Sequence, residues 1–287
     1  MSEARTAQSP AVSGRIAIVV LTYNRIHLLR QCVENVLART SNLTHEIVIW
    51  NNASSDGTRT YLDGLDDPRI RIVHHHENIG QNAYALAFQL TAAEYMLELD
   101  DDIIDAPPEW DRRLLEAFIR LPDVGFLAAN LVDNPNDATA RVMYGRDASL
   151  YSYVEENGAK LKLGPVGGGC TITSRELHDR VGGFRQNKKY VFWLEDAAFI
   201  KDIKKLGYRA AYLDDLQVLH AGGPFYSAVT VEKARYWADF TRRVARRQAV
   251  KRLLLRIPLV APLNRRFGWF EPPPPKEAGQ PQFGPTA

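Results

Sequence analysis

Residues 16–50 read IAIVVLTYNRIHLLRQCVENVLARTSNLTHEIVIW and contain the pattern that decides the fold. An apolar, β-branched run from Ile16 to Leu21 predicts a buried strand. Ile47 to Trp50 forms a second run of this kind. Between the two runs, apolar residues recur at helical spacing and share one face: Leu29, Cys32, Val33, Val36 and Leu37. The order strand, helix, strand predicts a βαβ unit with parallel strands.

The following fifty residues continue this alternation. Ile70 to Val73 predicts another strand, Gln81 to Ala93 a helix, and Tyr95 to Leu99 a buried strand that runs directly into three aspartates. Helices that alternate with apolar strands are typical of a parallel sheet covered on both faces. We therefore expect the α/β class, with a mostly parallel central sheet flanked by helices.

Composition narrows the functional classes. The chain has 287 residues, 45% of them hydrophobic and 24% charged, which suits one large domain with an appendage. Its two cysteines, Cys32 and Cys170, cannot form a disulfide framework, so a reducing, cytoplasmic location is expected. The first 15 residues lack the apolar core of a signal peptide, and the apolar stretch 253–263 is interrupted by Arg256 and two prolines. We expect neither secretion nor a membrane span.

Charge is unevenly distributed along the chain. Residues 233–266 contain eleven Lys or Arg and one acidic residue, so this segment has a net charge of +10 and the remainder sums to −8. Any contact with a polyanion is therefore expected at the basic segment. We divide the chain into a disordered leader over 1–14, an α/β domain over 15–225, a helical basic extension over 226–270, and a disordered tail over 271–287.

Polar residues follow three of the expected strands. They are Thr22 to Arg25, Asn51 to Thr58, and Asp100 to Asp102. Ligands of open parallel sheets bind at the carboxyl ends of the strands, so these segments are expected to line one crevice.

Three successive carboxylates repel one another unless a cation lies among them. In extended backbone, Asp100 and Asp102 point to the same side and Asp101 to the other. Mg²⁺ and Mn²⁺ bind one or two carboxylates and complete their coordination with phosphate oxygens and water. The sequence therefore predicts a divalent metal site, with a solvated acidic turn as the alternative.

Six segments in this order resemble a family 2 glycosyltransferase of the GT-A fold: IAIVVLTYNR, NNASSDGT, NIGQNAYA, LELDDD, VGGGCTITSRELHDRVGGF and WLEDAAF. The resemblance covers residues 15–221 and implies a GT-A domain. It also implies a metal-dependent hexosyltransferase that inverts the anomeric carbon and uses a nucleotide diphospho-sugar.

The resemblance assigns donor binding to the polar turns and the aspartates: Thr22, Tyr23, Asn24, Arg25, Asn51, Asp56, Asn78, Gly80, Asp100 and Asp101. The family usually has Asp where this chain has Asn51, and an amide still offers uracil both a donor and an acceptor. We expect a UDP-sugar first, and dTDP or GDP behind it. Asn51 and Asp56 can instead form an Asx turn, and Asn78 with Gly80 a helix start.

The resemblance further implies that Asp196 is the catalytic base and that Glu195 orients it or contacts the acceptor. Gly168, Gly169, Trp193 and Glu195 are the expected acceptor side, and Asp100, Asp102 and His220 the expected metal ligands. Each has an ordinary structural alternative. The acidic pair suits the first turn of a helix, Trp193 a core position, the glycines a flexible turn, and His220 a buried structural role.

The function expected from the sequence is sugar transfer to a glycan or lipid-linked acceptor, as in polysaccharide biosynthesis. A catalytically silent sugar-nucleotide or glycan binder of the same fold is the alternative. A nucleotidyltransferase is disfavoured, because no Gly-rich, basic phosphate loop occurs near the N-terminus. The basic extension suits an anionic membrane surface at the inner face of the membrane, or else a solvated helix or a partner. Its few interleaved aromatic residues disfavour nucleic acid.

Overall fold

The computed structural model describes residues 14–133, 150–221 and 231–257. The expected leader (except Gly14), the expected tail and parts of the basic extension lie outside the described residues. The chain divides into two compact units, residues 1–228 and 229–287.

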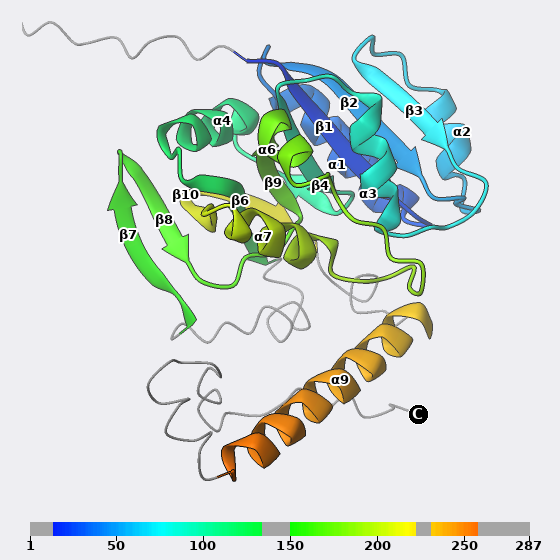
Figure 1. Ribbon diagram of the computed structural model, residues 1–287. Coiled ribbons are helices and arrows are strands. Elements are labelled where there is room, and N and C mark those ends of the chain that lie inside the picture. Colours follow the sequence, from blue (N-terminus) through cyan, green and yellow to red (C-terminus); the bar gives the residue numbers. More distant parts are fainter. Residues whose placement is uncertain (1–13, 134–149, 222–230, 258–287) are drawn as a thin grey trace, which may run out of the picture. The chain divides into compact units, whose positions relative to one another are not determined.

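The described residues of the first unit form one ten-stranded sheet with the strand order β3-β2-β1-β4-β9-β6-β10-β8-β7, and β5 pairs with β10 (Figure 1). The strands are β1 (Ile16–Thr22), β2 (Thr44–Asn51), β3 (Ile70–His74), β4 (Tyr95–Asp100), β5 (Ile103–Asp105), β6 (Val124–Asp133), β7 (Ser152–Glu156), β8 (Ala159–Leu163), β9 (Cys170–Ser174) and β10 (Arg209–His220).

The first four strands of the order pair in parallel, as do β6 and β10. β9 runs antiparallel between β4 and β6, and β5 and β8 run antiparallel to β10. The expected α/β class with a mostly parallel central sheet is confirmed.

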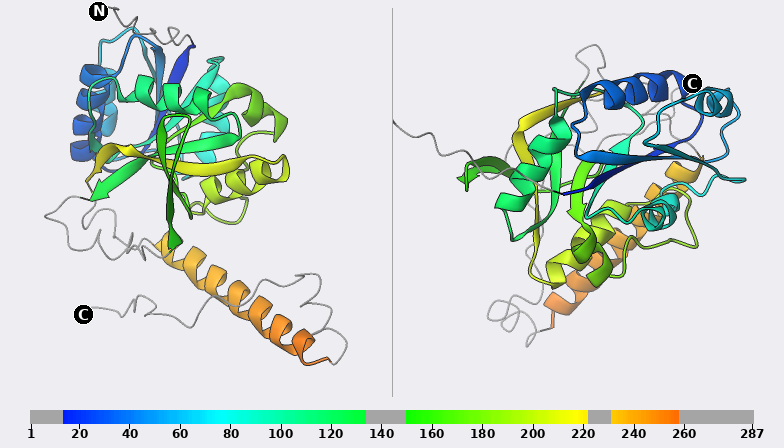
Figure 2. Two further views of the ribbon diagram at one scale, coloured as in Figure 1. Left: turned by 90° about the vertical axis from the view of Figure 1, so that its left-hand side faces the viewer. Right: turned by 90° about the horizontal axis from the view of Figure 1, so that it is seen from above.

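Helices cover both faces of this sheet. They are α1 (Ile26–Arg39), α2 (Thr58–Asp63), α3 (Asn82–Ala87), α4 (Trp110–Arg120), α6 (Arg175–Arg180) and α7 (Glu195–Lys205). Apolar residues of α1, α2 and α4 pack in one core cluster, and those of α3, α6 and α7 in another. Alternate residues of β1 enter the two clusters, Ile18 the first and Val19 the second, as the two-residue period of a strand requires. Seen from above, α1 and α7 lie on opposite sides of the strands (Figure 2).

The helix expected over Gln81 to Ala93 is shorter than the sequence indicates. α3 ends at Ala87 and a single 3₁₀ turn follows over Phe88–Leu90. The Arg175 guanidinium donates to the carbonyls of Phe88 and Thr91 at 3.0 and 2.7 Å, so α6 satisfies groups that would otherwise need a longer helix. Local periodicity contains no information about this distant partner.

The short strand β5 determines the geometry at the end of β10. The chain leaves β4 at Asp100, turns over Asp101 and Asp102, and β5 then pairs antiparallel with the end of β10, with Ile103 opposite His220. Ala221 donates its backbone N–H to the Asp102 carbonyl at 2.7 Å. Asp102 and Ala221, which are 119 positions apart in the chain, are thereby held together by a main-chain hydrogen bond.

The second unit contains α9 (Val231–Leu255). Among the helices described, none combines the length and the hydropathy that crossing a bilayer requires.

A buried carboxylate joins α4 to the segment that leads into β2. Asp111 lies in the first turn of α4 and accepts hydrogen bonds from Ser41 N at 2.8 Å, Ser41 Oγ at 2.8 Å and Thr44 Oγ1 at 2.7 Å. Hydrogen bonds to a charged acceptor are stronger than those between neutral groups. Asp111 therefore stabilises the packing of α4 beside the α1–β2 connection.

Replacing Asp111 with Ala should lower the free energy of unfolding by about 3 kcal/mol, because three buried donors lose a charged partner. Urea unfolding followed by circular dichroism measures this change. Asp66→Ala, at an exposed position, is the matched control and should change stability by less than about 0.5 kcal/mol. Equal effects of the two substitutions would contradict the assignment.

Candidate active site

The carboxyl ends of several strands meet at one edge of the sheet. Thr22, Asn51 and Asp100 end the parallel strands β1, β2 and β4, and His220 ends β10. β9 begins at this same edge, and Gly169 just before it accepts a hydrogen bond from Asp100 N at 2.8 Å. The edge is therefore surrounded by polar groups from five segments of the chain.

Asp100, Asp102 and His220 form a compact group. One ligand atom from each of the three lies within 4.8 Å of the others. The His220 Nε2 atom is 3.1 Å from Asp102 Oδ1, and both side chains are buried. The β5–β10 pairing brings Asp102 to His220, and the end of β4 places Asp100 beside them.

The surroundings shift the pKa of each member of this group. Burial and the charge of Asp102 raise the pKa of Asp100 to about 7. Burial also opposes ionisation of Asp102, but His220 and Arg25 outweigh it and lower the pKa of that carboxyl. Burial lowers the pKa of His220, and the Asp102 carboxylate more than offsets this, so that its pKa is raised. A cation beside Asp100 would favour its charged form.

Arg25 compensates part of the negative charge. Its Nη1 atom is 3.0 Å from Asp101 Oδ1 and 3.0 Å from Asp102 Oδ2. Burial opposes its charge, but the two carboxylates raise the pKa of Arg25. Burial raises the pKa of Asp101 to about 6 despite Arg25. The expectation that Asp101 points away from Asp102 is wrong, because the strand ends at Asp100 and the aspartates continue into a turn.

Two carboxylates and an imidazole are ligands that suit a divalent cation such as Mn²⁺. Their proximity and the raised pKa of Asp100 fit such a cation chemically.

A second acidic pair, Glu195 and Asp196, opens α7. Gly168 donates its backbone N–H to Asp196 Oδ2 at 2.7 Å. Burial raises the pKa of Asp196, and the hydrogen bond from Gly168 partly offsets this effect. Burial, Asp196 and Glu98 together raise the pKa of Glu195 well above its usual value.

Residues Gly167–Gly169, here called the glycine strap, connect the two acidic groups. A Cβ atom on Gly168 would lie 2.6 Å from Glu98 Oε1 and 3.7 Å from Asp196 Cβ. A Cβ on Gly169, where φ is +108°, would lie 3.2 Å from Asp100 Oδ2. Because one three-residue segment contacts both groups, they belong to the same site.

Glu98 is a site residue that the sequence reasoning missed. It lies in the apolar strand β4 and is only 3% exposed, and its Oε2 atom has no hydrogen-bond partner among the described residues. Burial, Asp100 and Asp196 raise the pKa of Glu98 well above its usual value. A carboxylate inside the buried run Tyr95–Asp100 was the signal, because such a residue seldom lies in a core without a functional or pairing reason.

The expected donor-binding turns are held by bonds within the protein. The Asn51 side chain accepts from Ser54 N at 2.9 Å through Oδ1 and contacts His74 Nδ1 at 3.1 Å through Nδ2. Asp56 accepts from Ile26 N at 2.9 Å, and Asn24 accepts from Ser55 N at 2.7 Å.

Asn51 and Thr22 are buried, whereas Tyr23 is an exposed side chain at this edge. Asp56 makes the Asx turn of the alternative, because its Oδ1 accepts from Thr58 N at 3.2 Å, whereas Asn51 Oδ1 accepts three residues on, from Ser54 N. Donor binding by the two residues stays a prediction.

Three further site candidates, Asn78, Gly80 and Trp193, make their contacts within the protein. Asn78 Oδ1 accepts from Gly80 N at 2.9 Å, and a Cβ on Gly80 would clash with the Val191 carbonyl. The helix that follows this turn, α3, has six residues. Donor binding by Asn78 and Gly80 stays a prediction. Trp193 is 8% exposed and donates its indole N–H to Asn82 Oδ1 at 3.1 Å. This burial agrees with the core alternative, and contact of Trp193 with an acceptor stays a prediction.

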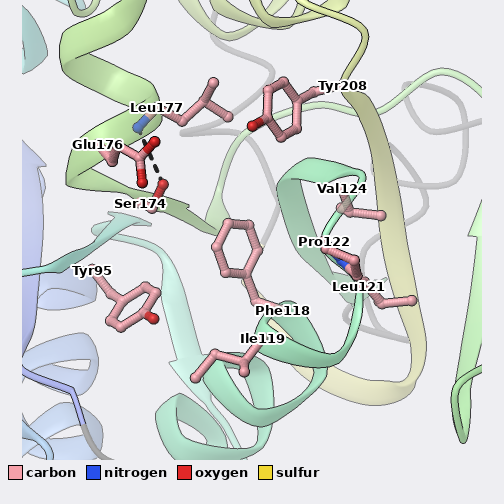
Figure 3. A pocket seen from close by; sticks show the side chains of 10 residues that line it. All are labelled: Tyr95, Phe118, Ile119, Leu121, Pro122, Val124, Ser174, Glu176, Leu177 and Tyr208. Carbon is pink, nitrogen blue, oxygen red and sulfur yellow. Dashed lines mark hydrogen bonds between the residues drawn. The ribbon is translucent and has the colours of Figure 1, made fainter.

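A cavity of about 260 Å³ lies elsewhere on the sheet, lined by apolar side chains with Ser174 and Glu176 (Figure 3). Its lining includes Tyr95 and Val124, which begin β4 and β6. It therefore lies at the amino ends of the parallel strands, away from the acidic site.

The family model described as glycosyl transferase family 2 matches residues 17–182. One curated relative, the putative colanic acid biosynthesis glycosyl transferase WcaA of Escherichia coli (strain K12), is 31% identical over 122 residues, which are 40% of this chain and 42% of the relative. The matched regions cover between 19% and 42% of the curated relatives' own lengths.

Two solved structures share the fold. The mannosyltransferase PcManGT from Pyrobaculum calidifontis, in complex with GDP-Man and Mn²⁺, superimposes with a TM-score of 0.55 at 22% identity, covering 84% of this chain and 66% of the other. GalNAc-T7 with UDP, GalNAc and Mn²⁺ gives a TM-score of 0.57 at 14% identity, covering 75% and 45%. With the matched family model, these findings show that the chain has the GT-A fold and belongs to glycosyl transferase family 2.

Proposed function

We propose that this chain is a metal-dependent, inverting hexosyltransferase that moves a sugar from a nucleotide diphospho-sugar to a hydroxyl of a glycan or lipid-linked acceptor. One observation carries the proposal: the glycine strap joins the Asp100, Asp102 and His220 group to the Glu195 and Asp196 pair within one buried acidic site.

Asp100, Asp102 and His220 would hold Mn²⁺ or Mg²⁺. When bound, the ion would neutralise the negative charge that the diphosphate gains as it leaves. Arg25 holds Asp101 and Asp102 in place and reduces their mutual repulsion. Two proteins of this fold have been solved with Mn²⁺ and a nucleotide or nucleotide sugar, which supports the proposed cofactor.

Asp196 is the proposed base. It takes the proton from the acceptor hydroxyl while the oxygen forms a bond to the anomeric carbon and the carbon–oxygen bond to the diphosphate breaks, with inversion in a single step. The backbone N–H of Gly168 orients the Asp196 carboxylate and holds one of its oxygens. Glu195 lies beside the base, and with Gly168 and Gly169 it forms the proposed acceptor side.

The donor is proposed to be a UDP-sugar, ahead of GDP and dTDP sugars. The Asn51 side chain is already bonded within the protein. The nucleobase of the donor would therefore contact Tyr23 or main-chain groups of the two turns, or displace the bonds of Asn51. WcaA is named for colanic acid biosynthesis, which supports an acceptor of the polysaccharide kind. We propose a cytoplasmic location for the reaction.

The function is tested with a panel of nucleotide sugars and Mn²⁺, by following slow donor hydrolysis and the release of nucleoside diphosphate. The wild-type protein should hydrolyse at least one donor of the panel. Asp196→Asn should reduce transfer about 10²- to 10⁴-fold, because the acceptor hydroxyl keeps its proton. Its affinity for the donor should remain nearly unchanged, as measured by calorimetry.

If the protein binds one donor tightly but hydrolyses none, it is the catalytically silent binder of this fold. Full transfer by Asp196→Asn would contradict the assignment of the base.

Asp102→Ala should weaken Mn²⁺-dependent donor binding at least tenfold, because it removes one proposed ligand and the partner of His220. Calorimetric titration with and without Mn²⁺ measures the effect, with Asp105→Ala as the exposed control on β5.

Mn²⁺ binding by the wild-type protein should also strengthen about tenfold between pH 6 and pH 8. Asp100, with a pKa of about 7, and His220, with a raised pKa, must lose protons before they bind a cation.

Equal donor affinity of Asp102→Ala and wild type would contradict the metal assignment.

Gly168→Ala should lower kcat about 10²-fold, because the new Cβ would meet Glu98 Oε1 at 2.6 Å and displace the strap from Asp196. Steady-state kinetics and thermal unfolding check it together. The matched control is Gly64→Ala, where the nearest atom to the new Cβ is 3.5 Å away. An unchanged kcat in Gly168→Ala would show that the strap does not position the base.

A further inference from the structure

α9 concentrates the positive charge of the second unit. It contains eight Lys or Arg residues, with Glu232 and Asp239 as its acidic residues. Arg242, Arg246 and Arg247 are exposed, and Arg242 pairs with Asp239 at 2.6 Å. The helix therefore presents guanidinium groups to solvent on more than one of its turns.

One face of this helix changes from basic to apolar along its length. Arg242, Arg246, Val250, Leu253 and Ile257 follow one another at spacings of four, four, three and four residues, so they form one stripe, here called the α9 stripe. Backbone bonds from Arg256 and Ile257 to Leu253 and Leu254 extend the helical path to its end. Its apolar members are exposed by 56% at Val250, 65% at Leu253 and 45% at Ile257.

We propose that the α9 stripe binds the surface of a membrane that carries anionic lipids. The arginines would pair with lipid phosphates, and the apolar end would enter the boundary between headgroups and acyl chains. Long Arg side chains lie along an apolar surface while their charged groups remain at the headgroups. The basic part and the apolar part of the stripe can therefore contact the same membrane surface at once.

The chemistry of the stripe favours a lipid surface over nucleic acid. Both partners attract guanidinium groups, but exposed aliphatic side chains gain nothing from a nucleic acid backbone, and none of the five stripe residues is an aromatic platform for bases. Surface binding needs no membrane-spanning length.

The proposal is tested by co-sedimentation of the full chain with vesicles of phosphatidylcholine alone and of phosphatidylcholine with about one third phosphatidylglycerol. Sedimentation should require the anionic lipid and fade between 0.05 and 0.5 M NaCl, because added salt shortens the Debye length and screens the attraction between exposed charges. Arg242→Gln with Arg246→Gln, the two basic members of the stripe, should weaken binding about thirtyfold, which is about fivefold for each charge lost near the surface. Leu253→Gln with Ile257→Gln should also weaken it.

The matched control for charge is Arg39→Gln with Arg59→Gln, two exposed arginines of the first unit, which should bind as the wild type does. Circular dichroism verifies that every variant keeps its helix content.

Equal sedimentation with neutral vesicles, or none with anionic vesicles, would overturn the proposal. Binding to duplex DNA as tight as to anionic vesicles, with no effect of the Leu253 and Ile257 changes, would identify a general polyanion site instead. Since sedimentation is measured without donor or acceptor, its outcome is independent of the proposed transferase activity.

Discussion

The pairing of β5 with the end of β10 is the constraint on which the site depends. It places the backbone of Asp102 against Ala221 and thereby sets the imidazole of His220 beside the Asp102 carboxylate. Asp100 then completes the group from the last position of β4. Concentrating carboxylates in a buried place is unfavourable unless positive charge compensates them. Arg25 supplies part of that charge, and a bound divalent ion would supply the remainder.

The glycine strap gives the site its second half. Side chains on Gly168 or Gly169 would collide with Glu98 or approach Asp100, so the chain passes between the acidic groups only where Cβ atoms are missing. The same closeness lets a main-chain N–H orient Asp196 without a further side chain. The fold thus brings a proposed metal group and a proposed base together through backbone as much as through side chains.

Much of this could be read from the sequence, and the failures have physical causes. The βαβ pattern over residues 16–50 and the polar strand ends were predicted because strand and helix periodicities are local properties. The turn at Asp101, the short α3, and the interior bonds of Asn51 and Trp193 depend on partners distant in the chain: Arg25, Arg175, His74 and Asn82. Glu98 was missed because the surrounding residues indicated only a buried strand.

The most direct test of the central claim is a crystal structure with Mn²⁺ and a nucleoside diphosphate, using anomalous scattering to locate the metal. The claim predicts one peak within coordination distance of Asp102 and His220, with the diphosphate on the side of the ion that faces Asp196. A peak bound elsewhere, or a diphosphate on the far side from Glu195 and Asp196, would contradict it.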